Sequence, residues 1–497
     1  MNLASLIDAH PDDSVALISR GRTTTYGELR EQVAGLRGGL RGLGLDPGDR
    51  VALVCANNWY FVISYLAVLG AGLVAVPLNP TSPPPEIEAE LAAIGARAVV
   101  VGPAGRATLA SIDRARVPAL EHLICAVGAE SDGWTSLDDL LAAAPSPAVE
   151  RDDDDLAVLI FTSGTAGSPK AAMLSHGNLQ ANIDQMQGHV ARAQDATDVA
   201  FGVLPMFHIF GLNVVLGVSL AAGSAVLLIE RFDPSSALEA IARHGVTIVA
   251  GAPTMWMAWA NLPESDAGAL GTVRLATSGA AKLPAEISVR MHERFAVDLT
   301  EGYGLTEASP VVTSATGMAP RYGSIGVPLS GVSVRLVDAD GDDVLVGDAG
   351  ELWVHGPNVF RGYWNDPEAT TAALTDDGWL RTGDIAVVDD DGLLSLVDRA
   401  KDLIIVSGFN VYPAEVEDVL IAHPAVEGVA VIGVAHPHSG EAVKAYLVVA
   451  AGAAVEEDDV IAFCEQRLAR YKCPDKVMFV DELPQGLGGK ILRRELR

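Results

Sequence analysis

Hydrophobic residues recur at helical spacing near the start of the chain. The recurring positions are Leu29, Val33, Leu36, Leu40 and Leu43. This spacing places them on one face of a helix, and Thr25 with Glu28 can form a capping box in front of them. The helix should stop near Gly44, and the segment DRVALVCAN (49–57) should form a strand.

The same order of helix and strand returns further along the chain. SSALEAIARHG (235–245) has helical periodicity, and VTIVAGAP (246–253) is a short apolar run typical of a buried strand. Repeated alternation predicts a layered α/β fold with largely parallel sheets. After about residue 320, short alternating runs between acidic and glycine-rich turns predict a smaller β-rich part, and from Asp398 the pattern is again mixed.

We therefore expect an α/β protein with two domains. The first, 1–398, comprises two layered α/β subdomains and the β-rich part over about 320–398. The second, 399–497, is a small α+β domain of ordinary domain size. A chain of 497 residues exceeds what one hydrophobic core usually serves, and we place the hinge in DRAKD (398–402).

Two uncharged runs, 60–78 and 212–229, are long enough to raise the possibility of a membrane span. Glycine interrupts each run, at 70–72 and at 223, and an apolar stretch typical of a buried strand follows. We expect no transmembrane segment and a buried helix followed by a buried strand in both places.

Composition and charge exclude several classes of partner. Hydrophobic residues make up 49% of the chain, so a large core is expected. Lys and Arg number 34 and Asp and Glu number 64, which gives 34 − 64 = −30. This balance disfavours nucleic acids and anionic membranes as partners, and any anionic ligand must be held by local donors.

Cysteine usage and the N-terminus indicate a cytoplasmic protein. The four cysteines are scattered and form no C-x-x-C pair, so a disulfide framework or a zinc site is not expected. The first residues, MNLASLIDAHPDDS, lack the basic start and apolar run of a signal peptide.

The stretch FTSGTAGSPKAAMLSH (161–176) combines hydroxyls, glycines and one lysine. Backbone N–H groups of a glycine-rich turn, hydroxyl donors and a lysine together suit a phosphate. The stretch does not match the P-loop pattern G-x-x-x-x-G-K-[ST], which disfavours a P-loop NTPase. On composition alone a Ser/Gly surface turn explains it equally well.

Four further segments extend this signal. They are EGYGLTE (301–307), GWLRTGD (378–384), DRAKDLIIVSGFNVYPAEVE (398–417) and LPQGLGGKILRREL (483–496). Together with TSGTAGSPK, in this order, they closely resemble the adenylate-forming superfamily of acyl-CoA synthetases, luciferases and peptide-synthetase adenylation domains. The resemblance covers essentially the whole chain, and the segments over 378–417 look most like fatty acyl-CoA synthetases.

The resemblance implies an AMP-forming acid–thiol ligase that uses ATP, Mg²⁺ and coenzyme A. A carboxylate attacks the α-phosphate of ATP to give acyl-AMP and pyrophosphate, and a thiol then displaces AMP. Charge gathers on phosphoryl oxygens in the first step, so catalysis would depend on positioning, positive charge and Mg²⁺.

Roles for nucleotide contacts follow by matching motifs. The phosphate loop would comprise Thr162, Ser163, Gly164, Thr165 and Lys170. Tyr303 would lie against adenine with Ala280 nearby, Thr306 would contact the α-phosphate, and Glu307 would hold Mg²⁺, for which a carboxylate is suited. Asp384 would accept the ribose hydroxyls, and Arg399 would add a charged contact.

The resemblance also implies a mobile C-terminal domain. Lys490 resembles the lysine that reaches the α-phosphate and the carboxylate during adenylation. Ser407, Gly408 and Phe409 belong to the loop that would enter for the thioester step, where a Cβ at Gly408 would obstruct pantetheine. Lys401 occupies the hinge position of the family.

The acyl pocket is expected along three segments, as the resemblance implies: LPMFHIFGLN (204–213), GAPTMWMAW (251–259), matched to the strand before SGAA, and SGAA itself (278–281). In the family, residues around EGYGLTE also line it. The candidate lining residues are His208 and Phe210 at the mouth, with Asn213, Gly217, Met255 and Gly304. Residues 204–213 contain no acid, and a buried, unpaired ammonium is costly, so α-amino acids are disfavoured. We expect a medium- or long-chain fatty acid.

Alternatives remain open at this stage. An aryl- or cinnamate-type ligase or a carrier-protein-loading enzyme would keep the same motifs. A non-catalytic acyl- or nucleotide-binding relative is disfavoured because Lys490, Glu307 and Asp384 are all present. Ala166 and Ala171 depart from the family pattern, as does Lys282, for which we have no account. Partners should be small molecules, and the chain could be a monomer or a homodimer.

Overall fold

The computed structural model describes residues 1–128, 133–162, 170–189, 193–263, 267–319, 321–399, 402–406, 409–436, 440–450, 452–485 and 491–496. The chain forms two compact units. The first comprises Met1–Tyr322, Pro328–Ser333 and Val354–Leu380, and the second comprises Gly323–Val327, Val334–Trp353 and Arg381–Arg497.

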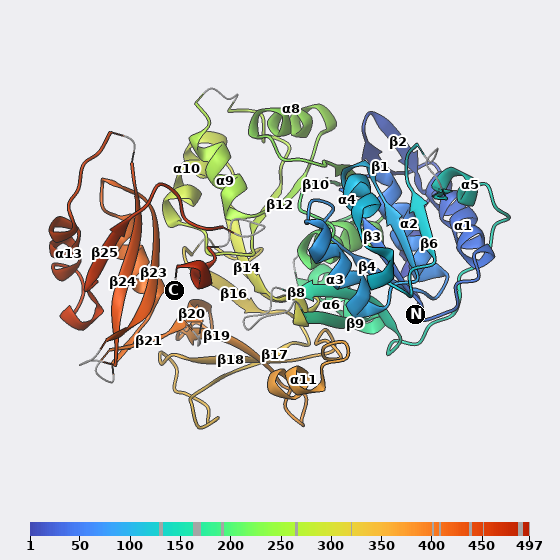
Figure 1. Cartoon of the computed structure of the whole chain (residues 1–497). Coiled ribbons are helices and arrows are strands. Elements are labelled where there is room, and N and C mark those ends of the chain that lie inside the picture. The colour runs from blue at the N-terminus through green and yellow to red at the C-terminus, as the bar shows by residue number, and fades with distance from the viewer. Residues whose placement is uncertain are drawn as a thin grey trace. The chain divides into compact units, whose positions relative to one another are not determined.

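The N-terminal part of the first unit is built on a sheet with the strand order β7-β6-β5-β3-β4-β8-β9. The strands are β3 (Arg50–Val54), β4 (Val74–Pro77), β5 (Ala98–Val101), β6 (His122–Cys125), β7 (Thr135–Ser136), β8 (Leu156–Thr162) and β9 (Lys170–Ser175). Neighbours are parallel except β9, which returns antiparallel to β8. The helices are α1 (Tyr26–Gly42), α2 (Trp59–Gly70), α3 (Pro84–Ile94), α4 (Arg106–Ser111) and α5 (Leu137–Leu141), and α1 packs against α2 and α5 (Figure 1).

The predicted first helix is confirmed as α1, including its cap. The Glu28 backbone N–H donates to the Thr25 hydroxyl (3.2 Å), and the Thr25 backbone N–H donates to the Glu28 carboxylate (2.9 Å). Leu29, Val33, Leu36 and Leu40 are fully buried. The apolar face and the capping box therefore act together to fix where this helix begins.

A second sheet of the first unit runs in the order β15-β14-β13-β12-β10-β11-β1-β2. Its strands are β1 (Val15–Ser19), β2 (Arg22–Thr25), β10 (Val199–Gly202), β11 (Ala225–Leu228), β12 (Ile248–Gly251), β13 (Leu275–Ser278), β14 (Leu299–Gly304) and β15 (Val311–Ser314). The strands from β1 to β14 in this order are parallel, and β2 and β15 are antiparallel edges of the series. The expectation of largely parallel sheets is confirmed.

Helices accompany this second sheet. They are α6 (His176–His189), the π-helix η4 (Phe210–Gly217), α7 (Val218–Ala222), α8 (Pro234–His244), α9 (Pro253–Asn261) and α10 (Ala285–Phe295). In Figure 1, α8, α9 and α10 lie together above the strands. The segment 251–259 was wrongly matched to the strand before SGAA: it forms most of α9, where Pro253 occupies the first turn, and the strand before SGAA is β13.

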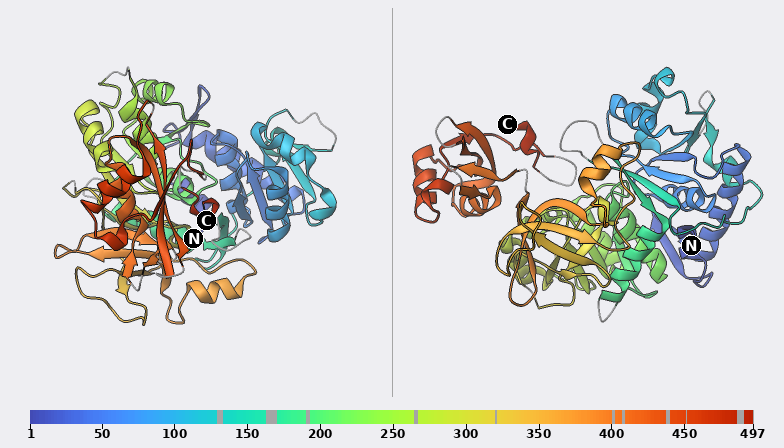
Figure 2. Two further views of the ribbon diagram at one scale, coloured as in Figure 1. Left: turned by 60° about the vertical axis from the view of Figure 1, so that its left-hand side comes forward. Right: turned by 90° about the horizontal axis from the view of Figure 1, so that it is seen from below.

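Asn57 joins the two sheets at the ends of β3 and β10. Its side-chain amide donates to the backbone carbonyls of Gly202 (3.0 Å) and Leu204 (2.7 Å), and its amide oxygen accepts from Met206 N–H (3.0 Å). Figure 2 shows the two halves, coloured blue and green, side by side in both views. This buried amide therefore fixes the start of the segment 204–213 against both halves.

Both uncharged runs fold as expected. The first forms α2 and β4, and the second forms η4, α7 and β11. Within the described parts of the chain, no helix is long and apolar enough to cross a membrane.

The second unit contains two β-sheets. One has the order β17-β18-β19-β20-β16, with β16 (Ser324–Pro328), β17 (Ser333–Val337), β18 (Gly350–His355), β19 (Leu380–Val388) and β20 (Leu394–Arg399). The other has the order β22-β21-β24-β23 with β25 beside β24, formed by β21 (Ile404–Val406), β22 (Phe409–Val411), β23 (Val426–His436), β24 (Gly440–Val449) and β25 (Lys476–Phe479). Helices α12 (Pro413–Ile421) and α13 (Glu457–Glu465) share its apolar core. The α/β class is confirmed, and the boundary at 398–399 stays a prediction.

Candidate functional site

The strands β8 and β9 bring the two ends of the glycine- and hydroxyl-rich stretch together. Thr162 lies opposite Lys170 in the antiparallel ladder, and the Thr162 hydroxyl donates to the Lys170 carbonyl (3.3 Å). Ser163, Gly164 and Thr165 lie outside the described residues. The ladder therefore places the first hydroxyl and the lysine of the predicted phosphate loop side by side.

The Lys170 ammonium is held by two neighbours from the segment after Gly362. It lies 5.4 Å from the centre of the Tyr363 ring and 4.0 Å from the Asp366 carboxylate. The Lys170 side chain is 35% exposed. These contacts orient its ammonium group, which remains accessible to solvent. A half-exposed ammonium in this position can attract an anion.

Glu307 is fixed by two hydrogen bonds to residues of the segment 360–363. Its carboxylate accepts from the Tyr363 hydroxyl (2.6 Å), and its backbone carbonyl accepts from Phe360 N–H (2.8 Å). Burial, with the nearby Glu307 charge, raises the pKa of Tyr363 above its usual value. The Tyr363 hydroxyl therefore stays protonated and donates to one carboxylate oxygen, and the other oxygen makes no hydrogen bond to the described residues.

The Glu307 carboxylate lies on a tight turn of the backbone between Gly304 and Pro310. Leu305 N–H donates to the Pro310 carbonyl (3.0 Å), and a Cβ on Gly304 would lie 2.3 Å from that same oxygen. Tyr303 is buried at the end of β14, and Thr306 and Glu307 begin the short helix η5 (Thr306–Ala308). Only glycine permits this close approach.

Of the predicted pocket-mouth residues, Phe210 lies against Gly279. A Cβ on that glycine would come within 3.1 Å of the Phe210 ring. His208 is exposed, and its ring accepts from Phe210 N–H (3.3 Å). Ala280 follows with φ 71°, a left-handed conformation that is unusual for alanine.

The first unit encloses a cavity of about 80 Å³ beside this turn. Its apolar lining comprises Met186, Ala200, Phe201, Val214, Val215, Val218, Ile248, Ala250, Leu275, Val311 and Leu329. Its polar lining comprises Gln187, His189, Gln194, Ser219, Thr277, Ser314 and Thr316. Val311 pairs with Gly304 across β14 and β15, so the cavity begins next to the turn that carries Glu307.

The predicted lining residues Asn213, Gly217 and Met255 do not line this cavity, although Asn213 and Gly217 directly precede the lining residues Val214 and Val218 in the sequence. The Asn213 amide donates to the carbonyls of Leu179 (3.2 Å) and Ser309 (2.7 Å). A Cβ on Gly217 would lie 2.8 Å from the Asn213 amide oxygen. Asn213 thus supports the turn that follows Glu307, while Val214 and Val215 face the cavity.

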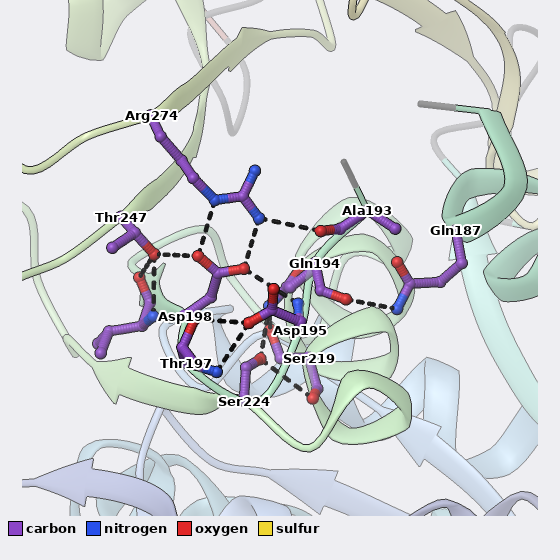
Figure 3. A network of polar contacts seen from close by, with 11 residues as sticks. Gln187, Ala193, Gln194, Asp195, Thr197, Asp198, Ser219, Ser224, Thr247 and Arg274 are labelled. Carbon is purple, nitrogen blue, oxygen red and sulfur yellow. Dashed lines mark hydrogen bonds and ion pairs between the residues drawn. The ribbon is translucent and has the colours of Figure 1, made fainter. Parts of the chain in front are cut away.

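A buried polar network stands behind the cavity (Figure 3). The Asp198 carboxylate, 2% exposed as a residue, accepts from two nitrogens of the Arg274 guanidinium and from the Thr247 hydroxyl (2.8 Å). Burial opposes ionisation of Asp198, but the hydrogen bonds from Arg274, Asp195 N–H and Thr247 outweigh it and lower its pKa below the usual value. The network ties β10, β12 and β13 together at their N-terminal ends.

In the second unit Asp384 lies opposite Arg399 in the ladder of β19 and β20. Asp384 is 7% exposed, and Gly383 before it has φ 69° and donates its N–H to Glu351 (3.0 Å). The pairing brings the two predicted ribose contacts together along the backbone. Phe409 is 57% exposed and stacks on Tyr471 with ring centres 4.8 Å apart. Lys401, Ser407, Gly408 and Lys490 lie outside the described residues.

Sequence reasoning missed two residues that the structure brings to the site. Tyr363 lies 56 positions from Glu307, and Gln187 lies on α6 among cavity residues from other elements. Neither belongs to a glycine-rich or charged motif, so no local signal marks them.

Comparison with known proteins agrees with this arrangement. The model of the family described as AMP-binding enzyme matches residues 5–364, and the model of the AMP-binding enzyme C-terminal domain matches 415–490. A feruloyl-CoA synthase from Amycolatopsis sp is 40% identical over 96% of this chain and 94% of its own. A long-chain-fatty-acid–CoA ligase from Yersinia pestis is 37% identical over 98% and 91%.

A solved structure has the same fold over the full length. The crystal structure of ATP-bound MatB from Rhodopseudomonas palustris superposes with a TM-score of 0.92 at 35% identity, covering 100% of this chain and 98% of that one.

The Asp198 network yields a prediction about stability. Asp198→Asn should lower the free energy of unfolding by about 2 kcal/mol, because hydrogen bonds to a charged group are lost or weakened. The lowered pKa of Asp198 means that its contribution is complete above the unfolded-state pKa of about 3.9, and is lost only as pH falls through the lower folded-state pKa. Urea unfolding at pH 5 to 8 should therefore give a constant difference from the unaltered protein.

Glu239→Gln serves as the control. It removes an exposed pair with Arg243 on α8, and such pairs contribute about 0–1 kcal/mol. A difference for Asp198→Asn that changes steeply between pH 5 and 8, or that does not exceed the control, would contradict this account of the network.

Proposed function

The chain belongs to the AMP-binding enzyme family, as an ATP-dependent acid–CoA ligase, and we propose that it activates a compact, uncharged carboxylic acid, most simply an aryl or cinnamate-type acid. The observation that carries this choice is the 40% identity to a feruloyl-CoA synthase over 96% of this chain. The cavity, with a volume of about 80 Å³, is smaller than an engineered cavity of about 150 Å³ that binds one benzene molecule. Any acyl group that enters it therefore requires movement of the lining side chains.

The charge of the lining supports an uncharged acyl group. Of the described residues that line the cavity, none is Asp, Glu, Lys or Arg. An ammonium or a second carboxylate placed there would lose its hydration without gaining a partner, which is costly. α-Amino acids and dicarboxylic acids are therefore poor candidates. The feruloyl-CoA synthase relative acts on an acid of the proposed class by its name.

A medium- or long-chain fatty acid is the second candidate. It follows from the segments over 378–417 that resemble fatty acyl-CoA synthetases, and relatives named as long-chain-fatty-acid–CoA ligases match nearly the whole chain. For this substrate the cavity would have to enlarge by side-chain rearrangement as the chain enters.

The roles of individual residues in ATP binding remain proposals. Thr162 and Lys170, with Ser163, Gly164 and Thr165 between them, would hold the β- and γ-phosphates. Tyr303, with Ala280 nearby, would contact adenine, Thr306 the α-phosphate, and Asp384 with Arg399 the ribose. In support of the first assignment, the accessible Lys170 ammonium stands beside the closed ends of the hairpin.

Glu307 fits the Mg²⁺ that such ligases use. Within the described residues, no group of three His, Cys, Asp or Glu side chains could hold a metal ion. One carboxylate oxygen left open beside the Tyr363 hydrogen bond suits Mg²⁺, which binds through one or two carboxylates plus substrate phosphates. When bound, the ion neutralises charge on phosphate oxygens.

The reaction proceeds in two balanced steps. The substrate carboxylate oxygen bonds to the α-phosphorus of ATP, and the bond to the bridging oxygen breaks, releasing pyrophosphate. The CoA sulfur then bonds to the acyl carbon, AMP leaves with its oxygen, and the thiol proton passes to solvent. The chain's proposed contribution is to orient both reactants and to place positive charge where the phosphoryl oxygens gain negative charge.

A substrate screen tests this proposal. Pyrophosphate release should be measured over benzoic, cinnamic, straight-chain fatty and amino acids, with and without CoA. Aryl acids should give the highest kcat/KM, CoA should be required for turnover, and amino acids should be near background. A rise in kcat/KM through the longest chains, at about 0.8 kcal/mol for each buried CH₂, would instead establish the fatty-acid candidate.

The Tyr363 hydrogen bond generates a second prediction. Tyr363→Phe keeps the ring beside Lys170 but removes the donor to Glu307. Because loss of a hydrogen bond to a metal ligand typically costs about 10- to 100-fold in metal affinity or activity, the variant should need about tenfold more Mg²⁺ for adenylate formation. Calorimetric titration with ATP at varied Mg²⁺ should show the same shift. Unchanged Mg²⁺ dependence in both measurements would remove Tyr363 from this role.

The two half-reactions give a third prediction. Lys490→Ala should slow adenylate formation by about 10²–10³, the scale for losing one donor to developing charge, and should largely spare thioester formation from supplied acyl-AMP and CoA. Gly408→Leu should do the reverse, because its side chain would obstruct pantetheine. Lys401→Pro should impair the exchange between the two, because proline fixes φ. Parallel loss of both activities in the first two variants would contradict separate roles.

A further inference from the structure

Polar groups from α6, β15 and the segment before β10 lie toward one end of the cavity, although Ile248 and Leu275 at that end are apolar. Ala250 pairs with Thr277 and Ile248 pairs with Leu275 across β12 and β13. The two parallel strands run toward Gly251 and Ser278, so the first pair lies nearer that edge and the second pair lies deeper. Gln194 precedes β10, and its side chain contacts residues at the start of β11. This end of the cavity is therefore remote from the turn that carries Glu307.

The antiparallel strand β15 also leads from the turn that carries Glu307 toward this end of the cavity. Val311 lies opposite Gly304, Ser314 lies opposite Gly302, and the Thr316 hydroxyl is 3.4 Å from that of Thr300. Moving along β15 thus leads from the Glu307 turn to the deep end. Along this path the lining changes from the apolar Val311 to the hydroxyl-bearing Ser314 and Thr316.

Most of these polar groups already have protein partners. The Gln194 amide donates both of its hydrogens, to the hydroxyls of Ser219 (2.8 Å) and Ser224 (2.6 Å). The Ser219 hydroxyl in turn donates to the Val215 carbonyl (2.6 Å), and a ring nitrogen of His189 lies 3.2 Å from the Ser314 carbonyl. These contacts hold the wall of the cavity in place.

Within the described residues, Gln187 leaves both an N–H and its amide oxygen without a protein partner, whereas the Gln194 amide leaves only its oxygen. The Gln187 amide nitrogen donates one hydrogen to the Gln194 carbonyl at 3.3 Å, and its amide oxygen makes no hydrogen bond within the described part of the chain. Figure 3 draws one dashed line from the Gln187 amide nitrogen to the Gln194 carbonyl and none from the Gln187 amide oxygen. The half-buried side chain thus has one acceptor and one N–H that can meet a ligand.

We propose that this end of the cavity binds a hydrogen-bonding substituent, most simply a hydroxyl, at the end of the acid remote from its carboxylate. The Gln187 amide is the group that forms a hydrogen bond with this substituent. The proposal rests on the proposed function, because it requires the acyl group to occupy this cavity. An apolar tip would cover the Gln187 amide and leave its acceptor without water or protein as a partner. Sites built to bind a hydroxyl discriminate against analogues that lack it for this reason.

The test compares acids that differ only by one remote hydroxyl, using the full-length enzyme with ATP, Mg²⁺ and CoA. The pairs are 4-hydroxycinnamic with cinnamic acid and 4-hydroxybenzoic with benzoic acid. The hydroxylated member should have the higher kcat/KM, by about 10- to 100-fold. Gln187→Leu, similar in size but unable to hydrogen bond, should reduce that ratio to within about threefold. Part of the change should be faster turnover of the unsubstituted acid.

Gln180→Leu is the matched control. The same substitution is made on α6, at a side chain that donates to Asp184 and does not line the cavity, and the ratio should stay at its original value. A ratio between paired acids is unaffected by a uniform loss of folded enzyme, so it separates recognition from stability.

The outcomes distinguish this inference from the proposed function. If the enzyme turns over aryl acids without preference for the hydroxyl, the inference is wrong while the function stands. If the preference exists but survives in Gln187→Leu, its assignment to Gln187 is wrong. If no aryl acid is turned over while fatty acids are, the proposed function fails and the inference falls with it.

Discussion

The close return of the backbone between Gly304 and Pro310 is the constraint on which the candidate site depends. A Cβ at Gly304 would stand 2.3 Å from the Pro310 carbonyl, so this fold of the chain requires glycine. The return displays Thr306 and Glu307 at its outer side and leads directly into Val311, which lines the cavity. A single turn therefore connects the Glu307 carboxylate to the wall of the cavity that we propose for the acyl group, and the Asn213 amide donates to the Ser309 carbonyl within that turn.

The acidic character of the protein makes its local cations important. With a net charge of −30, the overall field opposes an anionic substrate, and binding must come from donors close to the phosphates. Lys170 is the cation that we propose for this role: its ammonium lies 5.4 Å from the centre of the Tyr363 ring, while Asp366 lies at 4.0 Å, the outer limit of an ion pair. The same Tyr363 side chain donates to Glu307. One aromatic residue thus orients both a cation and a carboxylate.

The cavity and the hydrogen-bonded network around Asp198 would contribute to substrate specificity in different ways. Apolar side chains from parallel strands contribute shape, while buried hydrogen bonds around Asp198 and Gln194 fix the ends of those strands (Figure 3). In the described part of the chain, the Gln187 amide keeps one N–H and its oxygen without a protein partner, so a substituent on the ligand could bind there. Small rigid pockets discriminate in this way through the groups that remain unpaired.

The sequence by itself determined the elements and the chemistry of the motifs. Helical spacing and the Thr25–Glu28 box predicted α1, glycines at 70–72 and 223 separated helix from strand, and the ordered motifs indicated an ATP-dependent ligase. These signals are local, because periodicity and caps act within a few residues. Only the tertiary structure decided that 251–259 is mostly helix, that Asn213 supports a turn, and that Tyr363 meets Glu307 across 56 positions. Such contacts depend on how elements that are distant in the sequence pack together. The sequence around one residue of such a pair does not indicate which residue it will contact.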